Sequence, residues 1–540
     1  MKWIFFLVLV AEFLFFDRMT SRHYAGFYPQ WDDQIETLNE SYTGYEYRQA
    51  HGFLAGIGHT LSKPAAQGTL HSFWAMLAFE VAGKPSRTAA LAVNILAFIA
   101  WQVALIFAIK RGTGSYSLAW VAVGLTLALR WPWSGVQGSA TDFRLDHVTM
   151  CMMGITLVAA LQTNAFRSTV WSAVFGSAVG VTLLTRFLTG TYFALIFIGC
   201  LVWILMSDGR LRRSLNLGLA ALIATLLMAP CLWVNRQLVY EHYWIGHYYD
   251  ADGALWISHA SLSQAIVQFW TQLRTEQLGT AFWSAAGAAL IVLASGIRRS
   301  AQGHAASSED TGGTDRWALD TAILGAIFLA APGIVLPLQN QPFGVVLGVA
   351  VAGAMFLLLA FAAKLRARTA ALHSVIAASV AFAIGSGYFV VRQITLPNDA
   401  NFVADAHRVN AIADRIFATA PAGRLEEPRI AVDRIADYFE AQTLQIVCYE
   451  RHRVWMPFAI SLPLGLSAIP EETLMSQLSH SDFVLATEDG PVGPWPYDRQ
   501  THQLRPKIFS WCDTNLRPVD HFTVFGQRMI LYQRRDLPVL

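Results

Sequence analysis

One apolar stretch decides the fold of this chain: Thr88-Ala-Ala-Leu-Ala-Val-Asn-Ile-Leu-Ala-Phe-Ile-Ala-Trp-Gln-Val-Ala-Leu-Ile-Phe-Ala-Ile109. A helix needs about 20 predominantly apolar residues to cross the roughly 30 Å hydrocarbon core of a bilayer. The stretch therefore predicts a membrane-spanning helix. Lys110 and Arg111 follow it directly, and basic residues beside a span favour the cytoplasmic side.

The composition predicts the same class of protein for the whole chain. Hydrophobic residues make up 54% of its 540 residues and charged residues only 14%, with 18 Trp and 33 Phe, which is typical of a polytopic membrane protein. The formal net charge of +2 argues against a nucleic-acid partner, because such proteins concentrate Lys and Arg on one face. The five cysteines lack CxxC or zinc spacing, so no metal cluster is expected from them.

Further apolar stretches predict ten more membrane helices. The first, 3–16, has the charge order of a signal peptide but carries Glu12 and lacks a cleavage site, so we expect a retained helix. The stretch 68–83 is not counted among the ten, since it carries His71 and Glu80 and is expected to lie at the outer surface. The other predicted helices are 116–131, 147–164, 169–185, 188–206, 214–233, 279–296, 317–336, 343–363 and 371–391.

Basic residues beside the later spans then collect on one side, as the positive-inside rule requires. This predicts about eleven transmembrane helices with the N-terminus inside. The long loop 17–87, the loop around Asp146, the loop 234–278 and the tail from about 395 are expected outside. Residues 1–394 form the predicted transmembrane domain, and residues 395–540 a small extracytoplasmic domain.

The tail has the pattern of an α/β fold. An amphipathic helix is predicted over 404–417, and short strands over 429–432 and 482–486. The runs 522–525 and 529–532 read as a β-hairpin. Cys448 and Cys512 both lie in this domain. On an oxidising side of the membrane they could form a disulfide or stay as two free thiols.

Two acidic clusters stand in the predicted outer loops. The first is Asp32-Asp33 in Tyr28-Pro-Gln-Trp-Asp-Asp-Gln-Ile-Glu36, and the second is Thr141-Asp-Phe-Arg-Leu-Asp146. Each cluster also has a non-functional explanation. Paired acids in a long loop are usually solvated, and Asp146 at a helix start is favoured by the amide dipole. The topology, however, places both clusters on one side of the membrane, which makes them candidates for a site.

An ordered set of residues resembles the GT-C membrane glycosyltransferases. The set is the acidic pair, Lys63-Pro64, Arg144-Leu-Asp146 and Leu184-Thr-Arg-Phe187, and the resemblance covers about 1–290. The closest branch is that of the protein O-mannosyltransferases and lipid A aminoarabinose transferases, which implies a polyprenyl-phosphate-linked sugar as donor. The family usually has Asp-Glu at the acidic pair, which leaves the catalytic acid open between Asp32 and Asp33. Relatives often have Lys where this chain has Arg186.

The chemistry of glycosyl transfer suggests roles for these residues. A carboxylate must orient or deprotonate the acceptor hydroxyl, and Asp32 or Asp33 is the candidate base. Asp146 could hold the acceptor, orient a cation, or bind a divalent metal such as Mg²⁺ or Mn²⁺ together with Asp33. Cations stabilise the departing phosphate, and the candidates are Lys63, Arg186 and Arg236.

A third group of residues is expected to line the substrate pocket: Arg144, His242, Tyr243 and His247. The last three belong to an aromatic cluster that could equally be an interfacial Trp and Tyr belt. His242 and His247 are five residues apart and do not share a helix face, so they are not expected to form a metal pair.

These features predict an inverting glycosyltransferase that acts on a hydroxyl of a lipid, glycan or protein. The resemblance implies the bacterial inner membrane, with the active site on the periplasmic side among membrane lipids. Two other classes stay open. A transporter or flippase for lipid-linked sugars would place ionisable groups inside its helices, and a non-catalytic membrane scaffold would use the tail to bind a partner.

Overall fold

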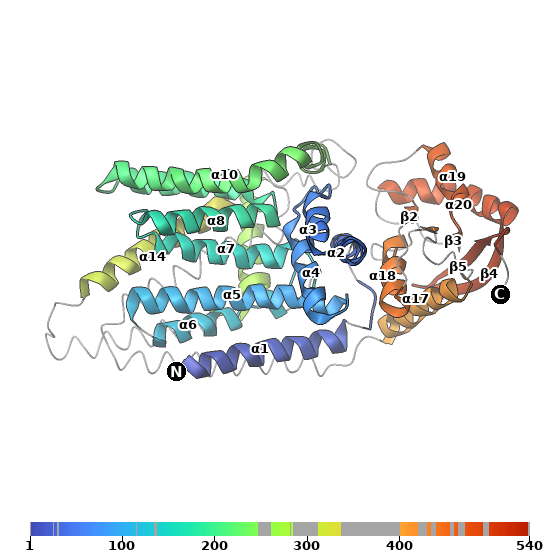
Figure 1. Ribbon diagram of the computed structural model, residues 1–540, viewed down its shortest axis with the longest axis horizontal. Coiled ribbons are helices and arrows are strands. Elements are labelled where there is room, and N and C mark those ends of the chain that lie inside the picture. The colour runs from blue at the N-terminus through green and yellow to red at the C-terminus, as the bar shows by residue number, and fades with distance from the viewer. Residues whose placement is uncertain are drawn as a thin grey trace.

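A computed structural model describes most of the chain (Figure 1). The described residues are 2–24, 26–29, 32–114, 116–133, 138–246, 261–280, 282–283, 311–335, 400–419, 429–433, 439–453, 458–462, 470–489 and 496–537. They form an N-terminal bundle of helices and a C-terminal unit in which helices pack on a sheet (Figure 1).

The bundle helices run side by side (Figure 1). They are α1 (Lys2–His23), α5 (Arg87–Thr113), α6 (Tyr116–Leu127), α7 (Leu145–Gln162), α8 (Thr169–Thr185), α9 (Thr189–Leu205), α10 (Arg210–Tyr240) and α14 (Thr311–Val335). Short helical segments accompany them: η1 (Trp131–Trp133), η2 (Glu241–Gly246), α12 (Leu262–Gln272) and η3 (Leu273–Leu278).

Three described helices are long and apolar enough to cross a membrane: α5, α7 and the helical stretch Arg210–Tyr243. The predicted spans 343–363 and 371–391 lie outside the described residues, and 279–296 is described only at its start. The predicted total of about eleven helices therefore stays a prediction.

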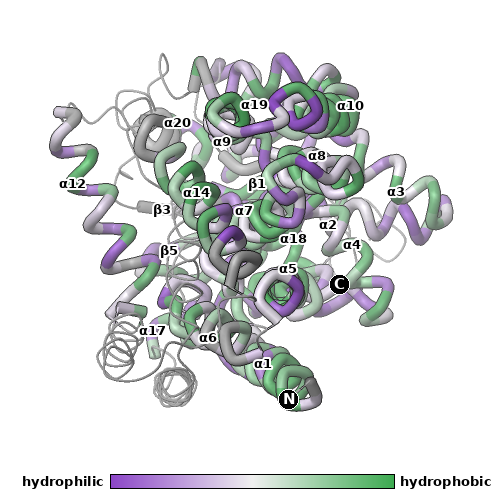
Figure 2. The backbone as a smooth tube through the Cα atoms, turned by 90° about the vertical axis from the view of Figure 1, so that its left-hand side faces the viewer, coloured by the Kyte–Doolittle hydropathy of each residue, from purple (hydrophilic) through white to green (hydrophobic). Residues whose placement is uncertain are grey.

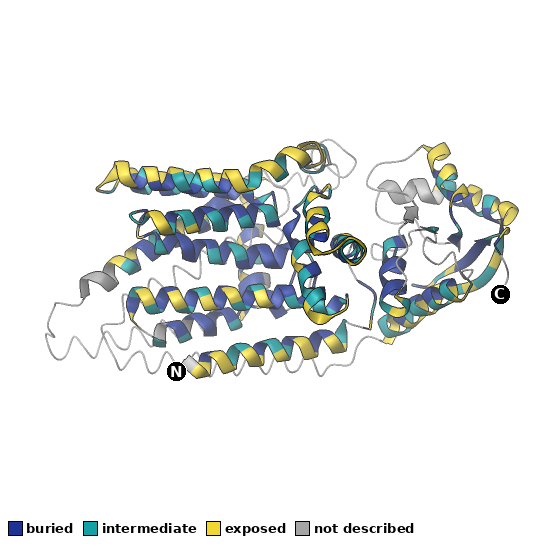
Figure 3. Ribbon diagram, viewed as in Figure 1, coloured by how far each residue is buried: buried dark blue, intermediate teal, exposed yellow. Residues whose placement is uncertain are grey.

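The helices differ in how far they are buried, as Figure 3 shows. Within its 18-residue apolar window, α7 is 83% buried, whereas the window of Arg210–Tyr243 is 17% buried. Large apolar side chains of α1 and α10 face outward, among them Trp3, Leu7, Leu226 and Trp233, and both helices carry much hydrophobic colour in Figure 2. An apolar outer surface around a helical core fits a bundle surrounded by lipid.

Three helices cover one end of the bundle: α2 (Asp32–His51), α3 (Phe53–Ser62) and α4 (Leu70–Ala82). Figure 1 views α2 end-on, so it runs across the bundle axis. Helix α4 falls on the stretch predicted to be interfacial. It packs against α2 and the start of α5 and is too short, at 13 residues, to cross the hydrocarbon core.

The C-terminal unit is built on a five-stranded mixed sheet of order β2-β1-β3-β5-β4. Strands β1 (Arg429–Asp433), β2 (Phe458–Leu462) and β3 (Phe483–Asp489) are parallel. Strands β4 (Leu516–Val524) and β5 (Gln527–Arg534) form the predicted hairpin, which pairs antiparallel with β3. Phe525 and Gly526 between them both have positive φ, 51° and 74°, as a two-residue type I′ turn requires.

Helices cover both faces of this sheet. The strands alternate their side chains, so that Ile430 and Val432 pack against one pair of helices and Ala431 packs against another. The first pair is α17 (Ala400–Thr419) and α18 (Ala441–His452), and the second is α19 (Glu471–Ser479) and α20 (Pro496–Asn515). Cys448 and Cys512 lie in these two separate cores, and both are free thiols. The disulfide left open by the sequence is therefore not formed.

Close packing of α8 against α10 generates a first prediction. A Cβ atom on Gly176 would meet the carbonyl oxygen of Ala220 well inside van der Waals contact and its Cα at 2.7 Å. We expect Gly176→Ala to force the helices apart and to destabilise the protein by about 1–3 kcal/mol. Thermal denaturation of the purified protein in detergent would show a lowered midpoint.

The matched control is Gly218→Ala on α10, where no atom lies within 4 Å of the added Cβ. It should keep or slightly raise the midpoint, because alanine favours a helix over glycine by roughly 0.5–1 kcal/mol. Equal midpoints for the two variants would contradict the close approach of α8 and α10.

Candidate functional site

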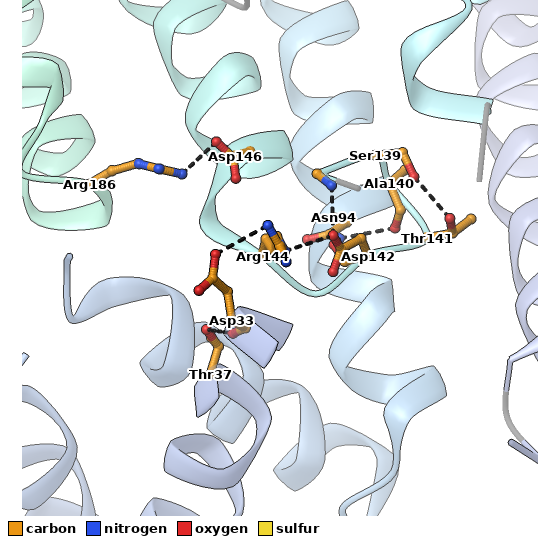
Figure 4. A network of polar contacts seen from close by, with 11 residues as sticks. Asp33, Thr37, Asn94, Ser139, Ala140, Thr141, Asp142, Arg144, Asp146 and Arg186 are labelled. Atoms are coloured by element: carbon orange, nitrogen blue, oxygen red, sulfur yellow. Dashed lines mark hydrogen bonds and ion pairs between the residues drawn. The ribbon is translucent and has the colours of Figure 1, made fainter. Parts of the chain in front are cut away.

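The two acidic clusters meet at the end of the bundle that α2 covers (Figure 4). The first cluster begins α2, and the second occupies the loop that enters α7. The turn between α8 and α9 contributes Arg186 to the same place. Of the acidic pair, Asp32 is the first residue of α2, and its side chain lies outside what the structure describes. The contacts below are those of Asp33.

The loop before α7 is hydrogen-bonded to a buried asparagine of α5, Asn94. Nδ2 of Asn94 donates to the carbonyl oxygens of Ala140 at 3.0 Å and Asp142 at 2.8 Å. The Asp142 carboxylate accepts a hydrogen bond from the Gly138 amide at 2.6 Å. Buried backbone groups need such partners, so these contacts fix the loop and the direction of the side chains that follow it.

Arg144 links the two clusters. It stands at the N-cap of α7, and its guanidinium lies 3.2 Å from Asp33 Oδ2 and 3.1 Å from Asp142 Oδ2. The two carboxylates differ in exposure, since the Asp33 side chain is 43% exposed and that of Asp142 only 3%. Arg144 therefore joins a buried loop acid to an accessible acid on α2.

Asp146 and Arg186 form a second ion pair next to the first. Arg186 Nη1 donates to Asp146 Oδ1 at 2.5 Å, with side-chain exposures of 16% and 10%. Burial lowers the pKa of Arg186, but Asp146, Tyr243 and Asp33 together outweigh this effect and leave the pKa raised. The guanidinium is thus a fixed positive charge, and the pair is too enclosed to be a solvated surface contact.

The segment after Lys63 is bound to the Arg186 turn through its backbone. The amides of Thr69 and Phe187 donate across to Leu184 O at 3.0 Å and Gln67 O at 2.8 Å. Gly68 is required there, because a Cβ atom would collide with the Thr185 carbonyl oxygen. Lys63 itself caps α3 and lies within electrostatic range of Glu40. The described contacts do not join it to Asp146 or Arg186.

The residues predicted after α10 are distributed differently. Tyr243 interacts electrostatically with Arg186 and Asp146, and His242 packs edge-on to Tyr243 with ring centroids 4.8 Å apart. His247 lies outside the described residues. Arg236 is exposed on α10, where it covers the Trp233 ring and donates to the Trp233 carbonyl at 2.6 Å. The described contacts thus link Tyr243 to the pair of Arg186 and Asp146, and Arg236 to Trp233.

The structure adds residues that the sequence did not single out. Asp142 was part of the quoted cluster but received no role, and Asn94 could have been noticed as an amide inside an apolar helix. His71 is fully buried, and its ring stacks on Phe143 with centroids 4.1 Å apart. Burial lowers the pKa of His71 to about 3, and the nearby His147 acts in the same direction, so the ring is neutral.

The described donors do not make a metal centre. Within the described ranges no group of three or more His, Cys, Asp or Glu side chains is placed to hold a metal ion. Asp33 and Asp146 each face an arginine, and these guanidinium groups would oppose a divalent cation. The suggested Mg²⁺ or Mn²⁺ site at Asp33 and Asp146 stays a prediction, and no step below depends on it.

The chain is similar in structure to ArnT from Cupriavidus metallidurans. The apo crystal structure matches with a TM-score of 0.48 and 13% identity, over 98% of this chain and 97% of that one. The form bound to undecaprenyl phosphate gives 0.48 and 14% identity, over 100% and 99%. The Archaeoglobus fulgidus oligosaccharyltransferase AglB, in complex with an inhibitory peptide and a dolichol-phosphate, gives 0.48 and 12% identity, over 90% and 69%.

No protein-family model matches the chain, and no curated protein matches it by sequence. The similarity of these structures to the chain is one of overall fold.

The buried loop acid generates a prediction about pH. Burial raises the pKa of Asp142 from 3.8 to about 7, although Arg144 and the Gly138 amide lower it in part. Between these two values the native state holds a proton that the unfolded state has lost. The stability that Asp142 contributes is therefore fully present below about pH 4 and is lost as the pH rises through about 7.

Denaturation midpoints of wild type and Asp142→Asn at about pH 5 and about pH 8 would test this sign. We expect the wild type to lose more stability than the variant over that interval. Asp208→Asn, at an exposed position between α9 and α10, is the control and should follow the wild type. Parallel curves for wild type and Asp142→Asn would contradict the raised pKa.

Proposed function

We propose that the chain is a membrane glycosyltransferase that transfers a sugar from a polyprenyl-phosphate-linked donor to a hydroxyl acceptor. The observation that carries this proposal is the pair of acid–arginine contacts at one end of the bundle, Asp33 with Arg144 and Asp146 with Arg186. It combines an accessible carboxylate with fixed positive charge, the two requirements of this reaction.

Asp33 is the proposed general base. Its carboxylate is partly exposed and held from one side by Arg144, so an acceptor hydroxyl can approach the other side. Asp32, one residue earlier on α2, is the alternative base.

Arg186 is the proposed binding group for the donor phosphate, and Asp146 holds it in place. In the proposed step the acceptor oxygen bonds to the anomeric carbon while its proton passes to the carboxylate of Asp33. The bond between that carbon and the phosphate oxygen breaks, and the polyprenyl phosphate leaves with the electron pair. Arg186 stabilises the charge that develops on the leaving oxygen. Lys63 and Tyr243 are proposed neighbours of the bound donor.

A single displacement of this kind inverts the anomeric configuration. The donor class comes from the sequence resemblance, and the acceptor is proposed to be a hydroxyl of a lipid, glycan or protein. We place the site on the periplasmic face of a bacterial inner membrane, following the predicted charge asymmetry of the loops. Residues 1–394 would then carry the reaction, and residues 395–540 would lie outside the membrane.

One observation favours a transporter as the second candidate. Glu12 lies in the middle of α1, is 6% exposed, and accepts a hydrogen bond from Gln102 Nε2 at 3.3 Å. Ionisable groups inside membrane helices often mark transport pathways. Sugar transfer that persists in Glu12→Gln would favour the transferase, because the proposed transferase does not use this carboxyl.

Sugar transfer by the purified protein tests the proposal. The donor panel would carry sugars on undecaprenyl and on dolichol phosphate. We expect Asp33→Asn to lower kcat by about 100- to 10,000-fold, the usual contribution of a general base. Asp146→Asn should instead raise the KM for the donor, because Arg186 loses the partner that orients it. Asp208→Asn and Glu12→Gln should leave transfer unchanged.

Each result has a defined meaning. Undiminished transfer by both Asp33→Asn and Asp32→Asn would remove the carboxylate base from the mechanism. Failure of the wild type to consume any donor would overturn the polyprenyl-phosphate assignment. If the wild type transfers no sugar but moves a lipid-linked sugar across vesicle membranes, and Glu12→Gln loses that movement with the fold intact, the transporter is favoured.

A further inference from the structure

Helix α18 of the C-terminal unit lies against α2, the helix that carries Asp33 (Figure 1). Three side chains on one face of α2 contact it. Asn39 donates to the Gln445 side chain, and Tyr42 Oη donates to Glu450 Oε1 at 2.7 Å. The Tyr449 hydroxyl donates to Glu46. The spacing of residues 39, 42 and 46 is that of a helix face, so the contact is continuous along α2.

Glu450 also binds the first residue of a bundle helix. The backbone amide and Nε of Arg87, at the start of α5, each lie 3.2 Å from Glu450 Oε1, and Arg87 Nη2 lies 3.2 Å from Oε2. The Arg87 side chain is 6% exposed and that of Glu450 16%. One carboxylate thus ties α2 and α5 together from the C-terminal unit, and its removal would leave a buried arginine without this partner.

A second contact fixes the segment just before α2. Tyr28 is 5% exposed and belongs to the core between the sheet and α17. Its ring packs edge-on to Phe402 at 5.0 Å and to Phe525 at 5.3 Å, while Phe27 stacks on Phe402 at 4.8 Å. The C-terminal unit therefore contacts the chain on both sides of Asp33, in the segment before α2 and along the middle of α2.

We propose that the C-terminal unit positions Asp33 for reaction by holding α2, and that Glu450 is the main positioning residue. This inference rests on the proposed function of Asp33. The pair between Asp33 and Arg144 is too exposed on the Asp33 side to fix the carboxylate by itself, because such pairs contribute little. The position of the carboxylate then comes from the helix, which packs against α4 on the bundle side and is held by α18 from the C-terminal unit.

The size of the expected effect follows from the geometry of proton transfer. A shift of about 1 Å in a reacting group can lower the rate about 100-fold. Glu450→Gln keeps an acceptor for Tyr42 but removes the charge that binds Arg87. We expect faster hydrogen exchange in α2 and a loss of about 10- to 100-fold in kcat.

The matched control is Arg451→Gln, one residue further along α18. Its guanidinium pairs with Asp414 of α17 at 2.7 Å and does not contact α2 among the described residues. The control removes a charged pair from the same helix and should leave both exchange in α2 and transfer unchanged. Tyr449→Phe, which removes only the hydroxyl bonded to Glu46, is the second test variant. If Glu450→Gln does not fold, hydrogen exchange in α2 and kcat are measured on Tyr449→Phe instead.

A double-mutant cycle on the full-length protein separates positioning from simple loss of folded protein. Loss of folded protein lowers transfer by the same factor with or without Asp33→Asn. Positioning of Asp33 predicts no further loss from Glu450→Gln once the Asp33 carboxylate is gone. Equal factors in the two backgrounds, or α2 exchange identical to wild type, would overturn the inference.

Hydrogen exchange distinguishes failure of this inference from failure of the proposed function. If Asp33→Asn keeps full transfer, Asp33 is not the base and its positioning for reaction is overturned with that role, even where Glu450→Gln loosens α2. If Asp33→Asn loses transfer while Glu450→Gln changes neither exchange nor kcat, the base role stands and the positioning role is overturned.

Discussion

The structure depends on arginine partners for the acidic side chains at one end of the bundle. Asp33 and Asp142 share Arg144, and Asp146 has Arg186. Charges removed from water need close partners, because desolvation costs several kcal/mol for each ion. The crossing of α2 over the bundle, the hydrogen-bonded loop before α7 and the close backbone contact at Gly68 each bring one member of these pairs into reach.

The three described acids are not equivalent, and burial separates their roles. The side chains of Asp142 and Asp146 are 3% and 10% exposed, against 43% for Asp33. A carboxylate that is enclosed by the loop can hold an arginine but cannot readily meet a substrate. The accessible acid sits on α2, which belongs to the covering layer and not to the bundle core. The position of Asp33 thus depends on how α2 is packed against its neighbours, among them α18 of the C-terminal unit.

Parts of this arrangement could be predicted from the sequence. The spans 88–109 and 147–164 fall on α5 and α7, because apolar length and flanking charge are local properties, and the hairpin follows from alternation around Gly526. Helix α18 was missed because it is buried on nearly all sides between α2 and the sheet, which removes the amphipathic period. Helix α20 contains Pro506, a residue that usually ends a helix.

The site shows the same limit. The acids and Arg186 stood out because charge is rare near apolar spans, but Arg236 has the same signal and its described contacts are with Trp233. Sequence does not tell which side of a helix meets the site. The predicted division at 394 and 395 stays a prediction, and the two parts share core residues. Ile446 and Tyr449 of α18 belong to the bundle core, and Tyr28 belongs to the core of the α/β unit. Each part completes the core of the other, so the covering layer that carries Asp33 is built from both ends of the chain.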